Sequence, residues 1–129
     1  MSEPIVFISH FQVKEGKLDG LKQSYQESAK RLEAAKPRTL VFLGYLNDSA
    51  THVSFVHAFA DAESMDLHVQ GAGERSRAAY EYLAPRGWEI YGRPSNPVLE
   101  LMRQEATSAG VTLSVHPDYL GGFLRLIRD

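Results

Sequence analysis

The chain begins with an alternation of apolar and polar positions that is typical of a β-strand. Residues 5–13 are rich in β-branched and aromatic types, and both side-chain faces of the segment are largely apolar. A strand of this kind belongs in the middle of a sheet that is covered on both sides. Leu18, Leu21, Tyr25, Ala29, Leu32 and Ala35 then recur at steps of three and four. This stripe predicts one long helix, which Pro37 ends.

Two further strands follow the helix and are joined by a short turn. Residues 39–46 and 51–59 have strand-like patterns, and residues 47–50 read Asn-Asp-Ser-Ala. Residues of these types favour a tight reversal of the chain. The sequence therefore predicts an antiparallel hairpin here.

A second helical region and a fourth strand come next. Asp61 is placed to cap a helix that carries its apolar residues on one side. Gly71 and Gly73 interrupt this helix, and a second helical piece is predicted at residues 74–83. Pro85 ends that piece, and a strand is predicted at residues 88–93.

The order of these elements is strand, helix, strand, strand, helix, strand. It predicts an α+β fold with a split β-α-β antiparallel sheet, helices on one face and a single domain over residues 1–94. The other sheet face would remain apolar and uncovered, and a second copy of the chain is the simplest cover. We therefore expect a homodimer with a small-molecule pocket in each subunit.

Residues 95–129 exceed what this unit requires. Asn96-Pro97 favours the start of a helix that Gly110 closes, and a fifth strand is predicted at 111–115. Residues 120–127 provide another extended piece. This extension either belongs to the same domain or is exchanged with the partner subunit.

Composition excludes several classes of function. The chain has 129 residues, 43% of them hydrophobic, with a net charge of −2 and no cysteine. Interspersed charges give no basic patch for nucleic acid, and the lack of cysteine rules out thiol chemistry and disulfides. No apolar run approaches the length of a membrane span, and the first residues do not resemble a signal peptide. We expect a cytoplasmic protein with neither nucleic-acid nor membrane partners.

A family resemblance is found at residues 55–68, which read Phe-Val-His-Ala-Phe-Ala-Asp-Ala-Glu-Ser-Met-Asp-Leu-His. This stretch has a strand, an aspartate cap and a histidine seven residues after the aspartate. In this respect the chain resembles the antibiotic biosynthesis monooxygenase-like group, and the resemblance extends over residues 4–94. The resemblance implies a ferredoxin-like βαββαβ sheet that pairs into a dimeric α+β barrel. It also implies oxygenation of a small aromatic substrate, such as a phenol, quinol or polyketide, without a cofactor. Other members of the group degrade haem, isomerise small metabolites or have no demonstrated activity.

The chain departs from the family pattern in several ways, which include Gly71 and Gly73 where relatives usually have a bulkier helical stretch. Many relatives carry an acidic residue in the third strand where this chain has His57, so their acid–base chemistry does not transfer to it. The asparagine, tryptophan and histidine set of haem-degrading members has no counterpart here, which disfavours haem.

The candidate catalytic residues are His68 first and His57 second. The resemblance carries over best to His68. This residue follows Met65 by three positions, at the margin of the apolar face of the helix, where it can point into a cavity and act as a base near neutral pH. His10, Trp88, Tyr91 and Phe55 are the candidate substrate-binding residues. The alternative for each is an ordinary place in the core or at a subunit contact.

No metal site is expected. If the first and third strands align at their centres, His10 falls near Val53 and His57 near Val6. The two imidazoles would then lie roughly 13 Å apart along the sheet, too far to share a metal. The sequence also lacks HxH and HExxH motifs.

Three functions remain open at this point. The first is a cofactor-independent monooxygenase in which a base deprotonates a phenol and the anion reduces dioxygen. The second is a non-catalytic small-molecule-binding or stress-responsive protein with the same barrel. The third is a non-oxidative isomerase or cyclase that uses a histidine to move a proton.

Overall fold

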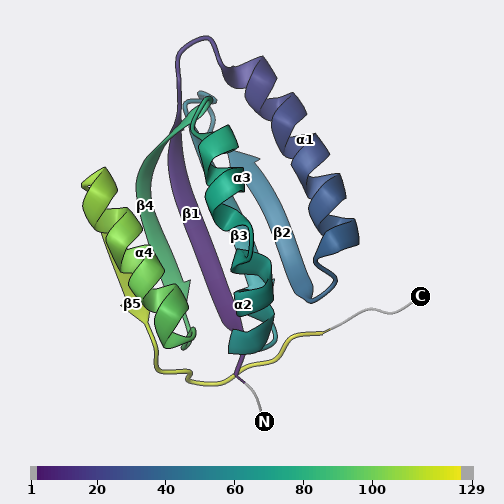
Figure 1. Cartoon of the computed structure of the whole chain (residues 1–129), viewed down its shortest axis with the longest axis vertical. Coiled ribbons are helices and arrows are strands. Elements are labelled where there is room, and N and C mark those ends of the chain that lie inside the picture. Colours follow the sequence, from purple (N-terminus) through teal and green to yellow (C-terminus); the bar gives the residue numbers. More distant parts are fainter. Residues whose placement is uncertain (1–2, 126–129) are drawn as a thin grey trace.

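The computed structural model describes residues 3–125 and shows one five-stranded sheet with its helices on one face (Figure 1). In chain order the elements are β1 (Ile5–Val13), α1 (Leu18–Ala35), β2 (Thr39–Leu46), β3 (His52–Phe59), α2 (Ala62–Val69), α3 (Ala72–Ala79), β4 (Leu83–Tyr91), α4 (Asn96–Ala109) and β5 (Thr112–His116). The strand order across the sheet is β2-β3-β1-β4-β5. Neighbouring strands are antiparallel, except that β5 runs parallel to β4. The predicted α+β, ferredoxin-like class is confirmed.

The segment between α2 and β4 corrects the predicted boundaries. Helix α3 ends at Ala79, and β4 begins at Leu83 and includes Pro85, whereas the strand was expected to begin at residue 88. The β1–β4 register shifts between His10 and Phe11, so that one residue of β4 is left over at a bulge beside Pro85. Proline is tolerated at such a bulge because one backbone N–H is not needed there.

The extension after β4 adds one helix and one strand, with β5 paired to β4 and α4 packed against both strands. Whether it belongs to the same domain or is exchanged with a partner subunit stays a prediction. Ser95, and not Asn96, caps α4, since its hydroxyl oxygen accepts a hydrogen bond from the backbone N–H of Val98. Gly110 ends the helix in the left-handed conformation, with φ of 69°, as its position predicted. Residues 117–125 form no helix or strand, and the last two residues of the predicted extended piece, 126–127, lie outside the described residues.

The two faces of the sheet are very different. The face toward the helices contains the buried side chains of Phe7, Phe11, Phe59, Trp88 and Ile90, which join Leu21, Met65 and Met102 from the helices in one core. On the opposite face no helix within residues 3–125 covers Leu43 and Tyr45, and these side chains are 46% and 61% exposed. No helix among the described residues is long and apolar enough to cross a membrane.

Candidate functional site

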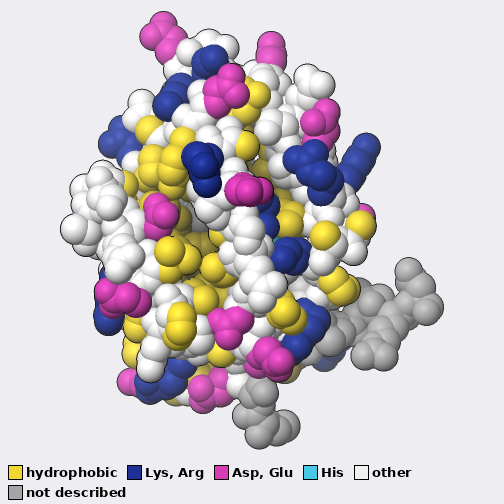
Figure 2. All heavy atoms as spheres, in the orientation of Figure 1, with side chains coloured by type: hydrophobic (Ala, Val, Ile, Leu, Met, Phe, Trp, Pro, Cys, Tyr) yellow, Lys and Arg dark blue, Asp and Glu magenta, His cyan; other side chains and the backbone are white. Residues whose placement is uncertain are grey.

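A pocket lies between the sheet and helices α1, α3 and α4. Its volume is about 220 Å³. Side chains from β1, β2, β3 and β4 form its floor, and hydrophobic side chains gather in the hollow between α4 and α3 (Figure 2). The lining includes Phe7, Phe11, Leu21, Tyr25, Phe42, Phe55, His57, His68, Arg75, Tyr80, Trp88, Met102 and Glu105. Most of this surface is aromatic or aliphatic, with a few polar groups, as is usual for sites that bind small organic molecules.

Two histidines lie side by side at one end of the pocket. His57 comes from β3 and His68 from the last turn of α2, and their ring centroids are 5.2 Å apart in an edge-on arrangement. Both are almost fully buried, with 6% of each residue exposed. The alternation of β3 turns His57 toward the helices, while the Asp61 cap positions the start of α2.

The hydrogen bonds of the two imidazoles identify the protonated nitrogen of His57 but not that of His68. His57 Nδ1 lies 3.1 Å from the carbonyl oxygen of Phe7, which only accepts, so Nδ1 carries the proton and donates. Nε2 of His57 is then a bare acceptor with no hydrogen-bond partner among residues 3–125. His68 Nδ1 lies 2.7 Å from the hydroxyl of Thr39, a group that can donate or accept.

Both imidazoles are neutral at physiological pH. Burial lowers the pKa of His57 to about 4, partly opposed by the hydrogen bond to Phe7 and reinforced by the charge of Arg75. Burial also lowers the pKa of His68 to about 3, with further contributions from His57, Arg75 and Lys36. A neutral histidine with a free ring nitrogen can accept a proton from an acidic ligand group.

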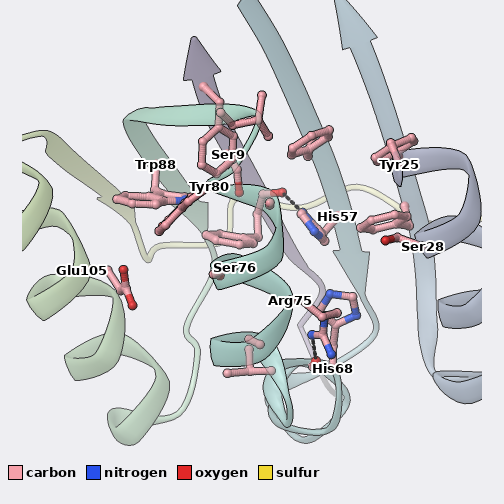
Figure 3. Close-up of a pocket in the computed structure, with 18 of the residues that line it drawn as sticks. Ser9, Tyr25, Ser28, His57, His68, Arg75, Ser76, Tyr80, Trp88 and Glu105 are labelled. Carbon is pink, nitrogen blue, oxygen red and sulfur yellow. Dashed lines mark hydrogen bonds between the residues drawn. The ribbon is translucent and has the colours of Figure 1, made fainter. Parts of the chain in front are cut away.

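Arg75 of α3 is the third polar group at this end, and Figure 3 shows it beside His68. Its guanidinium donates to the carbonyl oxygens of His68, at 2.5 Å, and of Gln70, at 3.1 Å. Burial lowers the pKa of Arg75, but a guanidinium remains charged in proteins.

Aromatic side chains form the remainder of the pocket. The Tyr25 ring stacks between those of Phe42 and Phe55, with centroid distances of 5.3 and 5.0 Å. Its hydroxyl is buried and has no hydrogen-bond partner among the described residues, and burial raises the pKa of Tyr25 to about 12. Trp88 and Glu105 lie at the opposite end from the histidines (Figure 3).

The structure brings four of the six candidate residues together and separates the other two. His57, His68, Phe55 and Trp88 line the pocket. His10 and Tyr91 do not, because their side chains point to the opposite face of the sheet. In the pairing of β1 with β3, His10 lies opposite Ser54 and His57 lies opposite Phe7. The predicted partners, Val53 and Val6, are each one residue away. A shift of one residue in the pairing of two strands changes which side chains lie on the same face of the sheet.

His10 and Tyr91 belong to a separate polar cluster on the uncovered face. Glu89 accepts hydrogen bonds from the Tyr91 hydroxyl and lies 2.5 Å from His10 Nε2. Tyr91 also stacks on His116 of β5, with a centroid distance of 4.6 Å. Even so, no three His, Asp or Glu side chains within residues 3–125 are grouped so that they could hold a metal ion.

Sequence reasoning missed Arg75 and the role of Tyr25. Arg75 lies three residues after Ala72 and four before Ala79, both of which also line the pocket. That helical spacing could have assigned Arg75 to the inner face of α3. Tyr25 was recognised only as part of the apolar stripe of α1.

Comparison with solved structures supports the architecture. MupZ from Pseudomonas fluorescens matches with a TM-score of 0.71 at 14% identity, over 96% of each chain. SnoaB, a cofactor-independent oxygenase from Streptomyces nogalater, matches with a TM-score of 0.58 at 14% identity, over 74% of this chain and 99% of SnoaB. A protein from Caulobacter crescentus, provisionally named an antibiotic biosynthesis monooxygenase, matches with a TM-score of 0.58 at 16% identity. The match covers 69% of this chain and 88% of the Caulobacter protein.

The chain has the fold of the antibiotic biosynthesis monooxygenase-like proteins. This confirms the resemblance seen at residues 55–68 at the level of architecture. No protein-family model and no curated protein sequence matches the chain. At identities of 12–18% the structural matches establish the fold alone.

Proposed function

We propose that the chain is a cofactor-independent monooxygenase that acts on a small aromatic substrate, a phenol, quinol or polyketide-like compound, in this pocket. The observation that carries the proposal is the pair of neutral imidazoles at one end of an aromatic pocket. The fold shared with SnoaB, which is described as a cofactor-independent oxygenase, adds support. Such chemistry requires a base and shelter from water, for which the histidines and the apolar lining are the proposed sources, while the substrate brings the oxidisable ring.

His57 is the proposed base, ahead of His68. Its Nδ1–H is held by the Phe7 carbonyl, so its lone pair is always on Nε2. His68 shares its Nδ1 with the Thr39 hydroxyl and is the second choice, as an orienting donor or alternative base. This reverses the order inferred from the sequence, because hydrogen bonds fix the tautomer of only one ring.

In the proposed reaction the phenol proton moves to His57 and the phenolate passes electrons to dioxygen. The negative charge of the phenolate offsets the burial that lowers the pKa of this imidazole in the empty pocket. One oxygen atom then enters the ring, which becomes a quinone, and the other leaves as water, so that phenol plus O₂ balances quinone plus water. Trp88 and Phe55 hold the ring by apolar burial and stacking. The apolar lining reduces the contact of the reactive intermediates with water.

The test is oxygen uptake by the purified protein with a panel of phenols and quinols, with isotopically labelled O₂ to follow the inserted atom. We expect His57→Gln to lower kcat about 100-fold or more, the usual contribution of a general base. His52→Gln is the matched control, since His52 is exposed in the β2–β3 hairpin. A His57→Gln variant with the wild-type rate excludes His57 as the base, and a wild type without uptake on the panel counts against oxygenation.

A non-oxidative isomerase or cyclase is the second candidate. The adjacent imidazoles favour it, because one ring can take a proton while the other returns one at a nearby atom. Product formation without oxygen uptake would identify this class. A protein that only binds its ligand would be expected to have an apolar cavity without histidines. Two histidines line this pocket, which favours an enzyme.

We also propose that the chain works as a homodimer through its uncovered sheet face. Val56 and Ile8 are only half-buried there, and Leu43 and Tyr45 are exposed. A second copy would cover these side chains and complete an α+β barrel. The cytoplasmic location and the absence of a nucleic-acid partner remain predictions from composition.

A further inference from the structure

We propose that the histidine end of the pocket binds a carboxylate through Arg75, so that the substrate is an aromatic or polyketide-like acid whose phenol group is next to the acid group, within reach of His57, and not a phenol without an acid group. The inference rests on the proposed function for the pocket being a substrate site. It adds the charge of the substrate and the direction in which the substrate lies.

The charge of Arg75 is not balanced by a carboxylate among residues 3–125. Arg38 and Arg93 each lie near an aspartate, Asp61 and Asp118 respectively. No carboxylate of the described residues comes within 4.0 Å of the Arg75 guanidinium, although the side chain is half-buried in the pocket lining. A partly buried cation without a counter-charge is unfavourable, and an anion that enters the pocket would relieve this cost.

Two cationic side chains, Lys36 and Arg75, lie at the end of α2. The Lys36 ammonium already donates to the carbonyl oxygens of Leu67 and Gln70, at 2.7 and 3.1 Å. Arg75 shares the Gln70 carbonyl and adds the His68 carbonyl. These two hydrogen bonds use two of the five N–H donors of a guanidinium and leave the rest for a planar, two-oxygen partner.

Local backbone structure holds Arg75 in this position. Gly71 has φ of 83°, a conformation that favours glycine, and it turns the chain between α2 and α3. A Cβ on Gly71 would also lie 3.3 Å from a terminal nitrogen of Arg75. The turn therefore leaves the carbonyl groups at the end of α2 open to the guanidinium.

The charges of the pocket set the direction of the ligand. Both imidazoles are neutral, so Arg75 provides the charge at the histidine end. Glu105 lies at the other end with Trp88 and Tyr80 (Figure 3), where burial and, after it, the charge of Glu105 raise the pKa of Tyr80. A carboxylate is attracted by Arg75 and repelled by Glu105, so the acid group lies near His57 and His68 and the ring points toward Trp88.

The test compares two probes of almost equal shape, 3-phenylpropionate and 3-phenylpropionamide, at neutral pH. Trp88 is the single tryptophan of the chain and lines the pocket, so its fluorescence reports occupancy directly. We expect the acid to bind about tenfold or more tightly than the amide. Arg75→Gln should remove this preference, because it should lower the affinity for the acid and leave the affinity for the amide unchanged.

Arg77→Gln is the matched control, since Arg77 is exposed on the same helix, and it should keep the wild-type preference. Arg75→Lys retains the charge and should keep part of the preference for the acid. It also provides a test if Arg75→Gln does not fold. Equal affinity of the wild type for acid and amide overturns the inference, as does an unchanged preference in Arg75→Gln or no binding of the acid. A preference for the acid without oxygen uptake would leave the inference standing and refute the proposed oxygenation.

Discussion

The chemistry of this protein depends at the residue scale on imidazoles kept neutral by their surroundings. His57 lies among the rings of Phe7, Phe42, Phe59 and His68, with centroid distances from 5.1 to 6.3 Å. A proton added to either histidine would be buried beside the charge of Arg75. The folded protein therefore resists protonation that an unfolded chain accepts near pH 6.5.

This resistance predicts a pH-dependent stability. The folded pKa values of His57 and His68, about 4 and about 3, lie below the ordinary value of 6.5, so the unfolded chain binds more protons in acid. The free energy of unfolding should decrease as pH falls from about 6.5 toward 4, with a slope of about 1.4 kcal/mol per pH unit for each histidine. Urea unfolding at a series of pH values measures this slope.

Substitution separates the histidines from the other titrating groups. His57→Gln retains a donor for the Phe7 carbonyl and should give a shallower slope than the wild type, whereas His52→Gln should not change it. Identical slopes for His57→Gln and the wild type would show that His57 titrates normally in the folded state.

At the same scale, the sequence predicted some of the candidate site and not the rest. His68 and Trp88 carried signals of their own, a helix margin and a strand position, and both line the pocket. His10 and Tyr91 carried the same kind of signal but lie on the opposite face. Strand periodicity assigns residues to two faces, and only the pairing with neighbouring strands shows which face the helices cover.

Close approach of α1 to the sheet is the main constraint at the scale of elements. Tyr25 of α1 lies over Gly44 of β2, where a Cβ would come within 2.9 Å of the tyrosine ring. The ring cannot move aside easily because Phe42 and Phe55 stack on it. The glycine in an otherwise ordinary strand is thereby explained by packing.

Gly44→Ala should therefore destabilise the fold by about 1–3 kcal/mol, the usual cost of an overpacked core. Gly73→Ala is the matched control, because no heavy atom lies within 4 Å of a Cβ added there. Chemical denaturation of the two variants and the wild type gives the comparison. A Gly44→Ala variant as stable as the wild type would mean that Tyr25 and α1 shift without cost.

Element boundaries show the limits of local patterns. The Asp61 cap and the Gly110 end of α4 were predicted because each is decided by a few neighbouring residues. The start of β4 was not, because Pro85 favoured a break in the local pattern. Its place in a strand depends on a bulge opposite His10 and Phe11, which are distant in the sequence.

At the scale of the whole molecule, the sheet has one face under the helices and one without a helix. The uncovered face carries exposed Leu43 and Tyr45 as well as the cluster of His10, Glu89 and Tyr91. An apolar surface of this kind usually marks an interaction site. The proposed dimer uses this face and leaves the pocket on the other side of the sheet.

We expect the protein to elute with twice the mass of one chain in size-exclusion chromatography with light scattering. Leu43→Glu should shift it toward the monomer, because a charge would be buried at the contact. Leu67→Glu is the control, since Leu67 is an exposed leucine on α2, away from this face. A wild-type monomer, or equal behaviour of the two variants, would refute the proposed contact.

The sequence by itself determined the order of helices and strands, the central place of β1 and the ferredoxin-like architecture. These follow from periodicity and from caps, which depend on residues close together in the chain. Only the tertiary structure decided that His57, His68 and Arg75 meet in one pocket while His10 and Tyr91 lie on the reverse of the sheet. Their proximity depends on strand register and on the turn at Gly71, where small changes in backbone path decide which side chains can meet.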